Sequence, residues 1–367
     1  MNKFLNLAVA GVRQLVPYVP GKPVDELQRE LGLTEIVKLA SNENPLGTGS
    51  KVAAAIQATL PELTRYPDGS GFGLKAALSA KLGVVPEQIT LGNGSSEILE
   101  LVARSFVTPD HEVVFSQHAF ALYPILTQAV GAQARVVPAS NYGHDLDAMR
   151  ASITDKTRLV FIANPNNPTG TLLPQAELEG FIAALPAHVL CVLDEAYYEF
   201  VDPKVRTESL QWPLRYPNLI IARTFSKAYG LAGLRIGYGI SSVDVADLLN
   251  RVRQPFNSNM LALAAAEAAL DDAEYLAQTL AVNNAGMAQL TSAFQELELE
   301  WIPSSGNFVS VDVKQNALPI YQALLQKGVI VRPIANYEMP NHLRISIGTE
   351  RENRVFIAAL AEVLRGV

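Results

Sequence analysis

The chain has 367 residues, enough for two domains of ordinary size, and 49% of them are hydrophobic, so we expect a large buried core. The formal net charge of -7 is scattered, with no basic run, which argues against nucleic acid and against a basic membrane contact. The single cysteine, Cys191, excludes an intrachain disulfide, and the sequence has neither a zinc-ligand spacing nor a P-loop.

The N-terminal region has some features of a signal peptide. Residues 4–12 are mostly apolar and follow Lys3. The apolar run is short, however, and Arg13 follows it directly. We therefore favour a segment that packs against the rest of the chain or against a second subunit. No other stretch approaches the length of a membrane span, so we expect a cytoplasmic protein.

The next part of the chain is rich in turns and contains a brief predicted strand that begins at Val37. Tyr18 and the polar turn at 42–45 can line a cavity, but a loop whose amides bond its own backbone explains them equally well. A helix is expected at 51–60, and a glycine-rich break follows it. Tyr66 lies in this break, where we expect an exposed aromatic ring.

From residue 88 onward, short apolar strands alternate with helices, which is typical of a parallel sheet. The first strand, 89–91, leads into Gly92-Asn-Gly-Ser-Ser-Glu97 and then into a helix. In this arrangement Ser95, Ser96 and the helix N-terminal amides can bind a phosphate. The alternative is that one of the serines only caps the helix.

Two later strands also end beside side chains that suit a ligand. The strand 112–115 leads to Phe120, which can stack on a planar ring or simply pack in the core. The strand 159–163 runs into Asn164-Pro-Asn-Asn-Pro-Thr-Gly170. Two prolines stiffen that turn, so it can hold the amide of Asn167 against a ligand.

The strand 189–193 ends at Asp194, where open α/β sheets place ligands, although an aspartate there can equally cap the following turn. Another apolar strand precedes Thr224-Phe-Ser-Lys-Ala-Tyr-Gly230, and Arg235 lies eight residues after Lys227. Hydroxyls with an arginine can cradle a phosphate, and a lysine beside them suits a Schiff base. Taken alone, the stretch is explained about as well by an ordinary strand and loop.

The C-terminal part of the chain changes character. A strand is predicted at 235–240, followed by helices that include 260–270 and 272–297, and then by mixed short strands and helices. We therefore predict an α/β fold with a large doubly wound, mostly parallel sheet domain and a smaller α+β C-terminal domain. The expected division is an N-terminal segment, 1–45, that packs on the small domain or on a partner subunit, a large domain, 46–265, and a small domain, 266–367.

Pyridoxal 5′-phosphate (PLP) makes five demands that these residues answer together. It needs a lysine for its aldehyde, an anion at the pyridine nitrogen, donors to the ring oxygen, an anion site for its phosphate, and a stacking partner. Each residue has an ordinary structural explanation, but together they favour a PLP site at the carboxyl ends of the strands. The answering groups, in that order, are Lys227; Asp194; Asn167 with Tyr197; Ser95, Ser96, Thr224, Ser226 and Arg235; and Phe120.

Several motifs carry a resemblance to a known family, and it covers essentially the whole chain. Asn167-Pro-Thr-Gly170, Asp194-x-x-Tyr197 and Ser226-Lys227 with Arg235 resemble the signature of fold-type I, PLP-dependent aminotransferases. Further stretches are similar to those of histidinol-phosphate aminotransferases: Ser41-Asn-Glu-Asn-Pro-Leu-Gly47, Arg65-Tyr-Pro-Asp-Gly69, Gly92-Asn-Gly-Ser-Ser-Glu97, and Val331-Arg-Pro333 through Leu343-Arg-Ile-Ser-Ile-Gly348.

The resemblance implies a role for each of these residues. Lys227 forms the Schiff base with PLP, Asp194 pairs with the ring nitrogen, and Tyr197 holds the ring oxygen together with Asn167. Phe120 stands where the family commonly has tyrosine, so it can stack but has no hydroxyl. The phosphate is bound by Ser95, Ser96, Thr224, Ser226 and Arg235.

The resemblance also implies a homodimer, in which Tyr66 reaches the partner's cofactor. Arg344, helped by Arg332 and Tyr18, binds the anionic groups of the substrates. The implied reaction is ping-pong transamination of histidinol phosphate with 2-oxoglutarate, giving imidazole-acetol phosphate and glutamate in histidine biosynthesis. The alternatives are an aromatic amino acid aminotransferase, a lyase resembling threonine-phosphate decarboxylases, and a PLP-binding regulatory module. No metal is expected.

Overall fold

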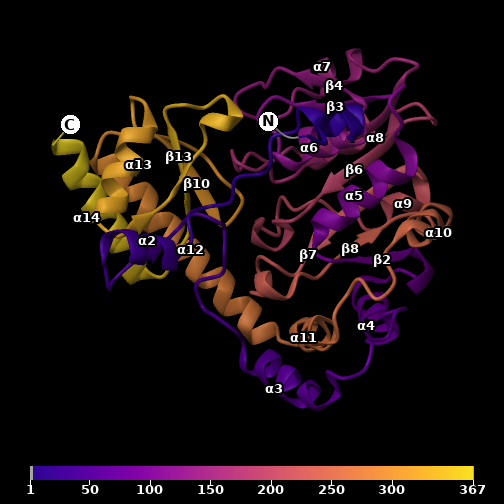
Figure 1. Cartoon of the computed structure of the whole chain (residues 1–367), viewed down its shortest axis with the longest axis horizontal. Helices are drawn as coiled ribbons and strands as arrows, with labels where there is room; N and C mark the ends of the chain where they lie inside the picture. The colour runs from indigo at the N-terminus through magenta and orange to yellow at the C-terminus, as the bar shows by residue number, and fades with distance from the viewer. Residues whose placement is uncertain (1–2, 367) are drawn as a thin grey trace.

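The computed structural model describes residues 3–366, which form two lobes connected by one long helix (Figure 1). The larger lobe is built around a seven-stranded sheet with the order β2-β8-β7-β6-β5-β3-β4. Its strands are β2 (Ile89–Gly92), β3 (Glu112–Ser116), β4 (Gln133–Val137), β5 (Thr157–Ala163), β6 (Leu190–Asp194), β7 (Leu219–Thr224) and β8 (Gly237–Ile240).

Strand β8 runs against both of its neighbours, whereas β3 to β7 are parallel to one another. The expected mostly parallel sheet is therefore confirmed. Gly237, the first residue of β8, pairs with the last residues of β2 and β7, Gly92 and Thr224. The loop that enters β8 therefore lies at the edge where the parallel strands end.

Both faces of the central strands β5, β6 and β7 are buried, which explains why these strands are mostly apolar, whereas the edge strand β4 is largely exposed. In β6, Cys191 and Leu193 belong to one core cluster, and Val192 belongs to the other. The first cluster includes residues of α3 (Ser50–Thr59), α4 (Phe72–Leu82), α7 (Leu146–Ala151), α8 (Gln175–Ala183), α9 (Trp212–Arg215) and α11 (Met260–Leu270). The second includes α5 (Ser95–Phe106), α6 (Leu122–Ala129) and α10 (Val243–Val252).

The smaller lobe contains a four-stranded antiparallel sheet with the order β12-β13-β10-β9. Its strands are β9 (Glu300–Ile302), β10 (Phe308–Asp312), β12 (Arg332–Pro333) and β13 (His342–Ser346). A separate core joins this sheet to three helices, α12 (Ala273–Glu296), α13 (Ala317–Gln326) and α14 (Glu350–Arg365). Short 3-10 helices occur at Leu5–Leu7, Leu60–Glu62, Pro86–Gln88, Tyr198–Phe200, Ala232–Leu234 and Ala335–Tyr337.

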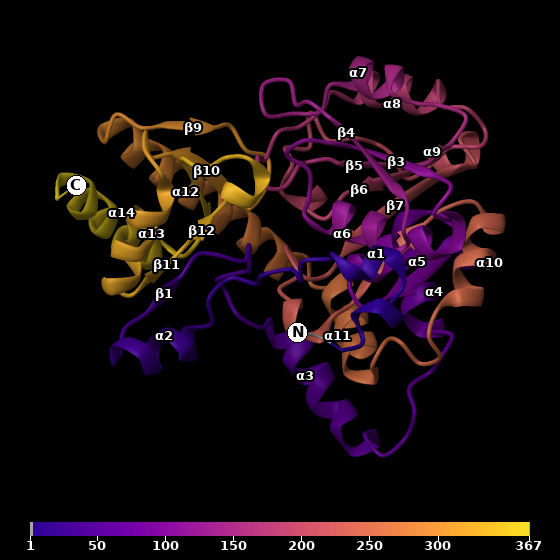
Figure 2. The same cartoon turned by 45° about the horizontal axis from the view of Figure 1, so that its top comes forward.

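The N-terminal segment contacts both lobes (Figure 2). Helix α1 (Ala10–Arg13) lies against α6, and a β-carbon on Gly11 would lie 1.9 Å from the carbonyl oxygen of Gln128. Helix α2 (Val24–Leu31) and strand β1 (Val37–Lys38) join the smaller lobe, where β1 pairs with β11 (Val329–Ile330). The proposed boundaries at 45/46 and 265/266 stay a prediction.

Two local features differ from the sequence patterns. Arg235 does not open a strand, because its φ of 58° is left-handed and β8 begins only at Gly237. Helix α4 is not predicted from the sequence, because its N-cap position is Gly71, which has no side chain to mark the start of a helix. Instead the side chain of Asp68 accepts a hydrogen bond from the backbone N–H of Phe72 at 2.7 Å. None of the described helices is long and apolar enough to cross a membrane.

Candidate active site

A pocket lies where β6 and β7 end, and residues of both lobes and of the N-terminal segment line it. It brings together all of the predicted site residues except Tyr66. Those residues are Tyr18, Ser95, Ser96, Phe120, Asn167, Asp194, Tyr197, Thr224, Ser226, Lys227, Arg235, Arg332 and Arg344.

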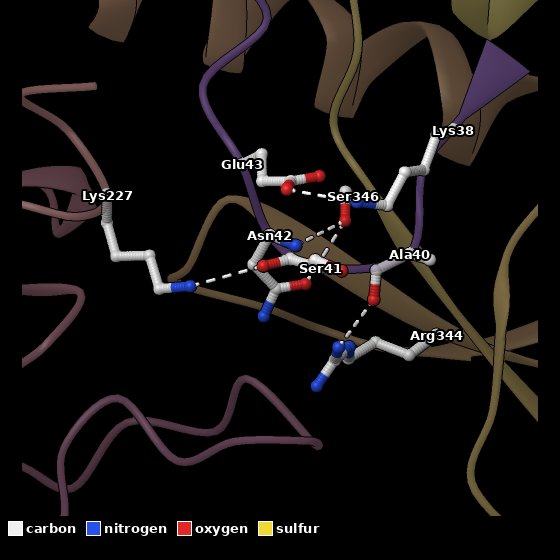
Figure 3. A network of polar contacts seen from close by, with 8 residues as sticks. All are labelled: Lys38, Ala40, Ser41, Asn42, Glu43, Lys227, Arg344 and Ser346. Atoms are coloured by element: carbon white, nitrogen blue, oxygen red, sulfur yellow. Dashed lines mark hydrogen bonds and ion pairs between the residues drawn. The ribbon is translucent and has the colours of Figure 1, made fainter. Parts of the chain in front are cut away.

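Lys227 follows β7 and lies on the pocket wall. Its Nζ donates a hydrogen bond to the carbonyl oxygen of Ser41 at 3.2 Å (Figure 3). Burial lowers the pKa of this amine to about 8, and the positive charges of Arg344 and Arg235 act in the same direction. A substantial fraction of the amine is therefore neutral near pH 8, as a nucleophile or base requires.

Asp194 is the last residue of β6 and is buried. Its Oδ2 accepts a hydrogen bond from the hydroxyl of Tyr123 at 3.0 Å, and its Oδ1 accepts one from the N–H of Ala196 at 3.2 Å. Burial raises the pKa of Asp194 to about 6, although both hydrogen bonds oppose this rise. Asp194 thus does more than cap the next turn, because its carboxyl group also lines the pocket.

Tyr123 is a residue that the sequence analysis did not assign to the site. Its ring stacks on Phe161, with centroids 4.5 Å apart and planes at 4°, and it meets Phe120 edge-on at 5.9 Å. It therefore fixes the carboxyl group of Asp194 and supports Phe120 on the pocket wall. Its position three residues after Phe120, at the start of α6, is the only hint in the sequence.

The hydroxyl of Tyr197 is held by two amides from different parts of the chain. It accepts hydrogen bonds from Nδ2 of Asn42 at 2.9 Å and from Nδ2 of Asn167 at 3.1 Å. Burial raises the pKa of Tyr197 to about 12, and the nearby charge of Arg344 and the bond from Asn42 oppose that rise. Both explanations of the polar turn at 42–45 apply. Asn42 lines the pocket, and Oδ1 of Asn44 accepts a hydrogen bond from the backbone N–H of Leu46 within the turn.

Five pocket residues at or near the start of α5 carry hydroxyls or a guanidinium, and this group is called the cradle below: Ser95, Ser96, Thr224, Ser226 and Arg235. Nη1 of Arg235 donates to Oγ of Ser226 at 3.2 Å, and Oγ1 of Thr224 donates to the same atom at 3.0 Å. The N-cap of α5 is Gly94, without a side-chain cap, so neither serine is the N-cap residue. A β-carbon on Gly94 would lie 2.4 Å from Nη2 of Arg235. Glycine therefore lets the guanidinium lie against this helix N-terminus.

Arg344 and Arg332 lie directly opposite each other on β13 and β12. Nη1 of Arg344 donates a hydrogen bond to Oδ1 of Asn167 at 2.6 Å, and Nη2 donates one to the carbonyl oxygen of Ala40 at 2.8 Å. The third nitrogen of the guanidinium, Nε of Arg344, is buried and has no hydrogen-bond partner. None of the ion pairs between described residues includes Arg344. Arg332 donates to the carbonyl of Val19 at 2.7 Å. A buried guanidinium without a carboxylate calls for an anionic ligand.

Tyr18 and Tyr66 complete the predicted set in different ways. The ring of Tyr18 lies 5.7 Å from the guanidinium of Arg332, at the mouth of the pocket. Tyr66 is 81% exposed and stacks on Phe256, with centroids 4.6 Å apart. Within a single chain, Tyr66 therefore does not reach the pocket.

The raised pKa of Asp194 predicts a pH-dependent stability. The folded chain binds this proton more tightly than the unfolded chain, whose aspartate has a pKa near 3.8. Its contribution to the free energy of unfolding should therefore fall by about 3 kcal/mol as the pH rises from about 4 to about 6. Asp194→Asn removes this term, so the variant should gain stability relative to the wild type over that range.

Urea unfolding of the ligand-free proteins at several pH values measures this difference. Tyr123→Phe removes a hydrogen bond that favours the carboxylate, and it should make the fall larger. A difference between wild type and Asp194→Asn that stays constant from pH 4 to pH 7 would contradict the burial effect.

Comparisons with known proteins agree on one family. Residues 34–360 match the family model "Aminotransferase class I and II". The chain is 62% identical to histidinol-phosphate aminotransferase 2 of Pseudomonas fluorescens over 98% of both chains, and 59% identical to histidinol-phosphate aminotransferase 1 of Nitrosococcus oceani, again over 98% of each.

Solved structures give the same result. The histidinol-phosphate aminotransferase of Sinorhizobium meliloti, solved in complex with pyridoxal-5′-phosphate, has a TM-score of 0.90 and 32% identity, with 96% of each chain covered. Aspartate aminotransferase of Thermus thermophilus with maleate has a TM-score of 0.85 at 21% identity, over 97% of this chain and 99% of that one, and shares the fold. The chain therefore belongs to the class I and II aminotransferase family and has its fold-type I architecture.

Proposed function

We propose that this aminotransferase uses PLP to pass the amino group of histidinol phosphate to 2-oxoglutarate, giving imidazole-acetol phosphate and glutamate in histidine biosynthesis. The observation that carries this proposal is one pocket in which Lys227 lies with the buried Asp194 and with two separate cationic groups, Arg235 and Arg344. Identities of 53–62% to curated proteins with this activity in their names support the choice of substrate. A cytoplasmic location follows from such a role, and cell fractionation would test it.

The residues present fit PLP. The cradle at the start of α5 offers hydroxyls, a guanidinium and free helix N–H groups to a phosphate, and Gly94 leaves room for them. Asp194 would hold the pyridine nitrogen, and Phe120 would cover one ring face. The hydroxyl of Tyr197 already accepts two amide hydrogen bonds, so its own hydrogen is free to point at the ring oxygen beside Asn167.

Each side chain then has a defined task. When bound, PLP supplies an aldehyde that takes up the amino group and a ring that withdraws electrons from the carbon that loses its proton. Lys227 would hold the cofactor through Nζ and move a proton at that atom, for which a pKa of about 8 suits it. Asp194, once ionised, stabilises a positive charge on the ring nitrogen.

The substrate anions would bind at Arg344 and Arg332. These two side chains are cross-strand neighbours and both line the pocket. Nε of Arg344 has no partner, which leaves a donor for a carboxylate or a phosphate. Since glutamate and histidinol phosphate take turns in the same pocket, one arginine pair would serve both acids.

We also propose a homodimer in which Tyr66 enters the partner's pocket. Tyr66 lies beside the exposed apolar side chains of Leu63 and Phe256, and such a surface suits a second copy of the chain. Mixing Tyr66→Ala with Lys227→Ala tests this arrangement. If Tyr66 acts across the interface, hybrid dimers contain one complete site, and activity should recover to about a quarter of the wild-type value. If it acts within its own chain, mixing restores nothing.

The substrate assignment predicts a selective half-reaction. Histidinol phosphate should convert the absorbance of the PLP-loaded protein fully, and 2-oxoglutarate should restore it. Phenylalanine should act much more slowly, and threonine phosphate should release no carbon dioxide. Rapid conversion by phenylalanine with none by histidinol phosphate would assign an aromatic aminotransferase, and carbon dioxide release would assign a lyase.

In the same assay Arg344→Ala should weaken both acids. Removing a buried charged partner costs about 3 kcal/mol, which corresponds to a rise in the apparent KM of about 100-fold for each substrate. The exposed Arg351 provides a matched control, and Arg351→Ala should leave both KM values unchanged. An Arg344→Ala enzyme that loses affinity for neither acid would remove this residue from the anion site.

A further inference from the structure

The backbone N–H, the carbonyl, Oδ1 and Nδ2 of Asn42 each have a hydrogen-bond partner, and only 1% of the residue is exposed. Its N–H donates to Oγ of Ser346 at 2.7 Å, and the same hydroxyl donates to Oδ1 of Asn42 at 3.2 Å (Figure 3). Its carbonyl accepts from Nδ2 of Asn307 at 3.1 Å. The remaining group, Nδ2, donates to the hydroxyl of Tyr197. The amide therefore has one orientation, which is fixed from the smaller lobe.

The backbone at this position is also special. Asn42 has a φ of 53°, in the left-handed region, which asparagine and glycine tolerate better than most residues. Three successive residues thereby bond three groups of the pocket. The carbonyl of Ala40 accepts a hydrogen bond from Arg344, and that of Ser41 accepts one from Lys227 (Figure 3). The amide Nδ2 of Asn42 donates to the hydroxyl of Tyr197.

The bond from Asn42 changes what Tyr197 can do. A phenol oxygen that accepts two N–H groups becomes a stronger donor through its own hydrogen, because the donors stabilise charge on the oxygen. Nδ2 of Asn167 donates the second of these hydrogen bonds, at 3.1 Å, so without Asn42 the phenol oxygen would accept only one. Removing the amide of Asn42 would leave Tyr197 less firmly aimed and a weaker donor.

We propose that Asn42 is a positioning residue that aims and strengthens the hydrogen bond from Tyr197 to the ring oxygen of PLP, and that Ser346 fixes its orientation. This inference rests on the proposed cofactor and extends it to a residue outside the set that contacts the ring. Asn42 acts through Tyr197, and its contacts with Ser346 and Asn307 connect that bond to the smaller lobe.

The test is a pH titration of the absorbance of PLP bound to the protein. Asn42→Gly removes the amide and keeps the left-handed backbone accessible. A weaker donor leaves the ring oxygen more basic, so the chromophore should hold its proton to higher pH, with the midpoint raised by about 0.5 unit. Ser346→Ala should raise it by less. Asn141→Gly, at another asparagine with positive φ that does not line the pocket, should leave it at the wild-type value.

The same substitution in a Tyr197→Phe background separates positioning from a general structural effect. Because Asn42 acts through the phenol, Asn42→Gly should produce no further shift there. A wild-type midpoint in Asn42→Gly, or an equal shift in both backgrounds, overturns the inference while the proposed function stands. A wild-type protein that binds no PLP overturns both. If Asn42→Gly does not fold, the midpoint of Ser346→Ala is compared with that of the wild type instead. An unchanged midpoint in Ser346→Ala would then overturn the inference.

Discussion

Three cationic side chains, Lys227, Arg235 and Arg344, line one pocket, and each is hydrogen-bonded only to neutral acceptors among the described residues. Those acceptors are the carbonyls of Ser41, Ala40 and Ala232, the hydroxyl of Ser226, and the amide oxygen of Asn167. The positive charge is therefore left for ligands. It also lowers the pKa of Lys227, since each arginine disfavours a third positive charge.

A buried ion pair between Arg223 and Glu195, the sequence neighbours of Thr224 and Asp194, shows the contrast. Arg223 lies on β7 and donates to Oε2 of Glu195 at 2.7 and 2.9 Å, and Ser209 occupies the other carboxylate oxygen. The guanidinium and the hydroxyl together occupy both carboxylate oxygens of Glu195. By comparison, the cations of the pocket bond only neutral acceptors among the described residues, so their charge can be neutralised by ligands. An enzyme that binds two anionic substrates and an anionic cofactor requires this arrangement.

Much of this arrangement could be predicted from the sequence, because the central strands β5, β6 and β7 are mostly apolar and polar residues stand at or just after their ends. Asp194, Asn167 and Ser95 all lie just at or beyond strand ends, and the pocket unites them. The position of Arg235 is harder to predict from the sequence. Arg235 precedes β8, and it lies at the same edge of the sheet because β8 is antiparallel to β2 and β7. The left-handed φ of Arg235 leaves no signal in the local pattern.

Other parts of the site depend on contacts between distant segments. Asn42 bonds Tyr197, 155 residues away, and Tyr123 bonds Asp194, 71 residues away. Neither pairing follows from spacing or periodicity, because each is set by how the N-terminal segment and α6 pack against the sheet. Tyr66 raises a different problem, because its predicted role requires a second chain. The local sequence predicts only that the ring of Tyr66 is exposed, and the structure confirms this.

The claim on which the rest depends is that the amine of Lys227, and no other, joins the aldehyde of PLP. Incubating the protein with PLP, reducing it with borohydride and mapping the labelled peptide tests that claim most directly. We expect one labelled site, Lys227, and no specific label in Lys227→Arg. Labelling confined to exposed lysines, with Lys227 unmodified in the folded protein, would contradict it.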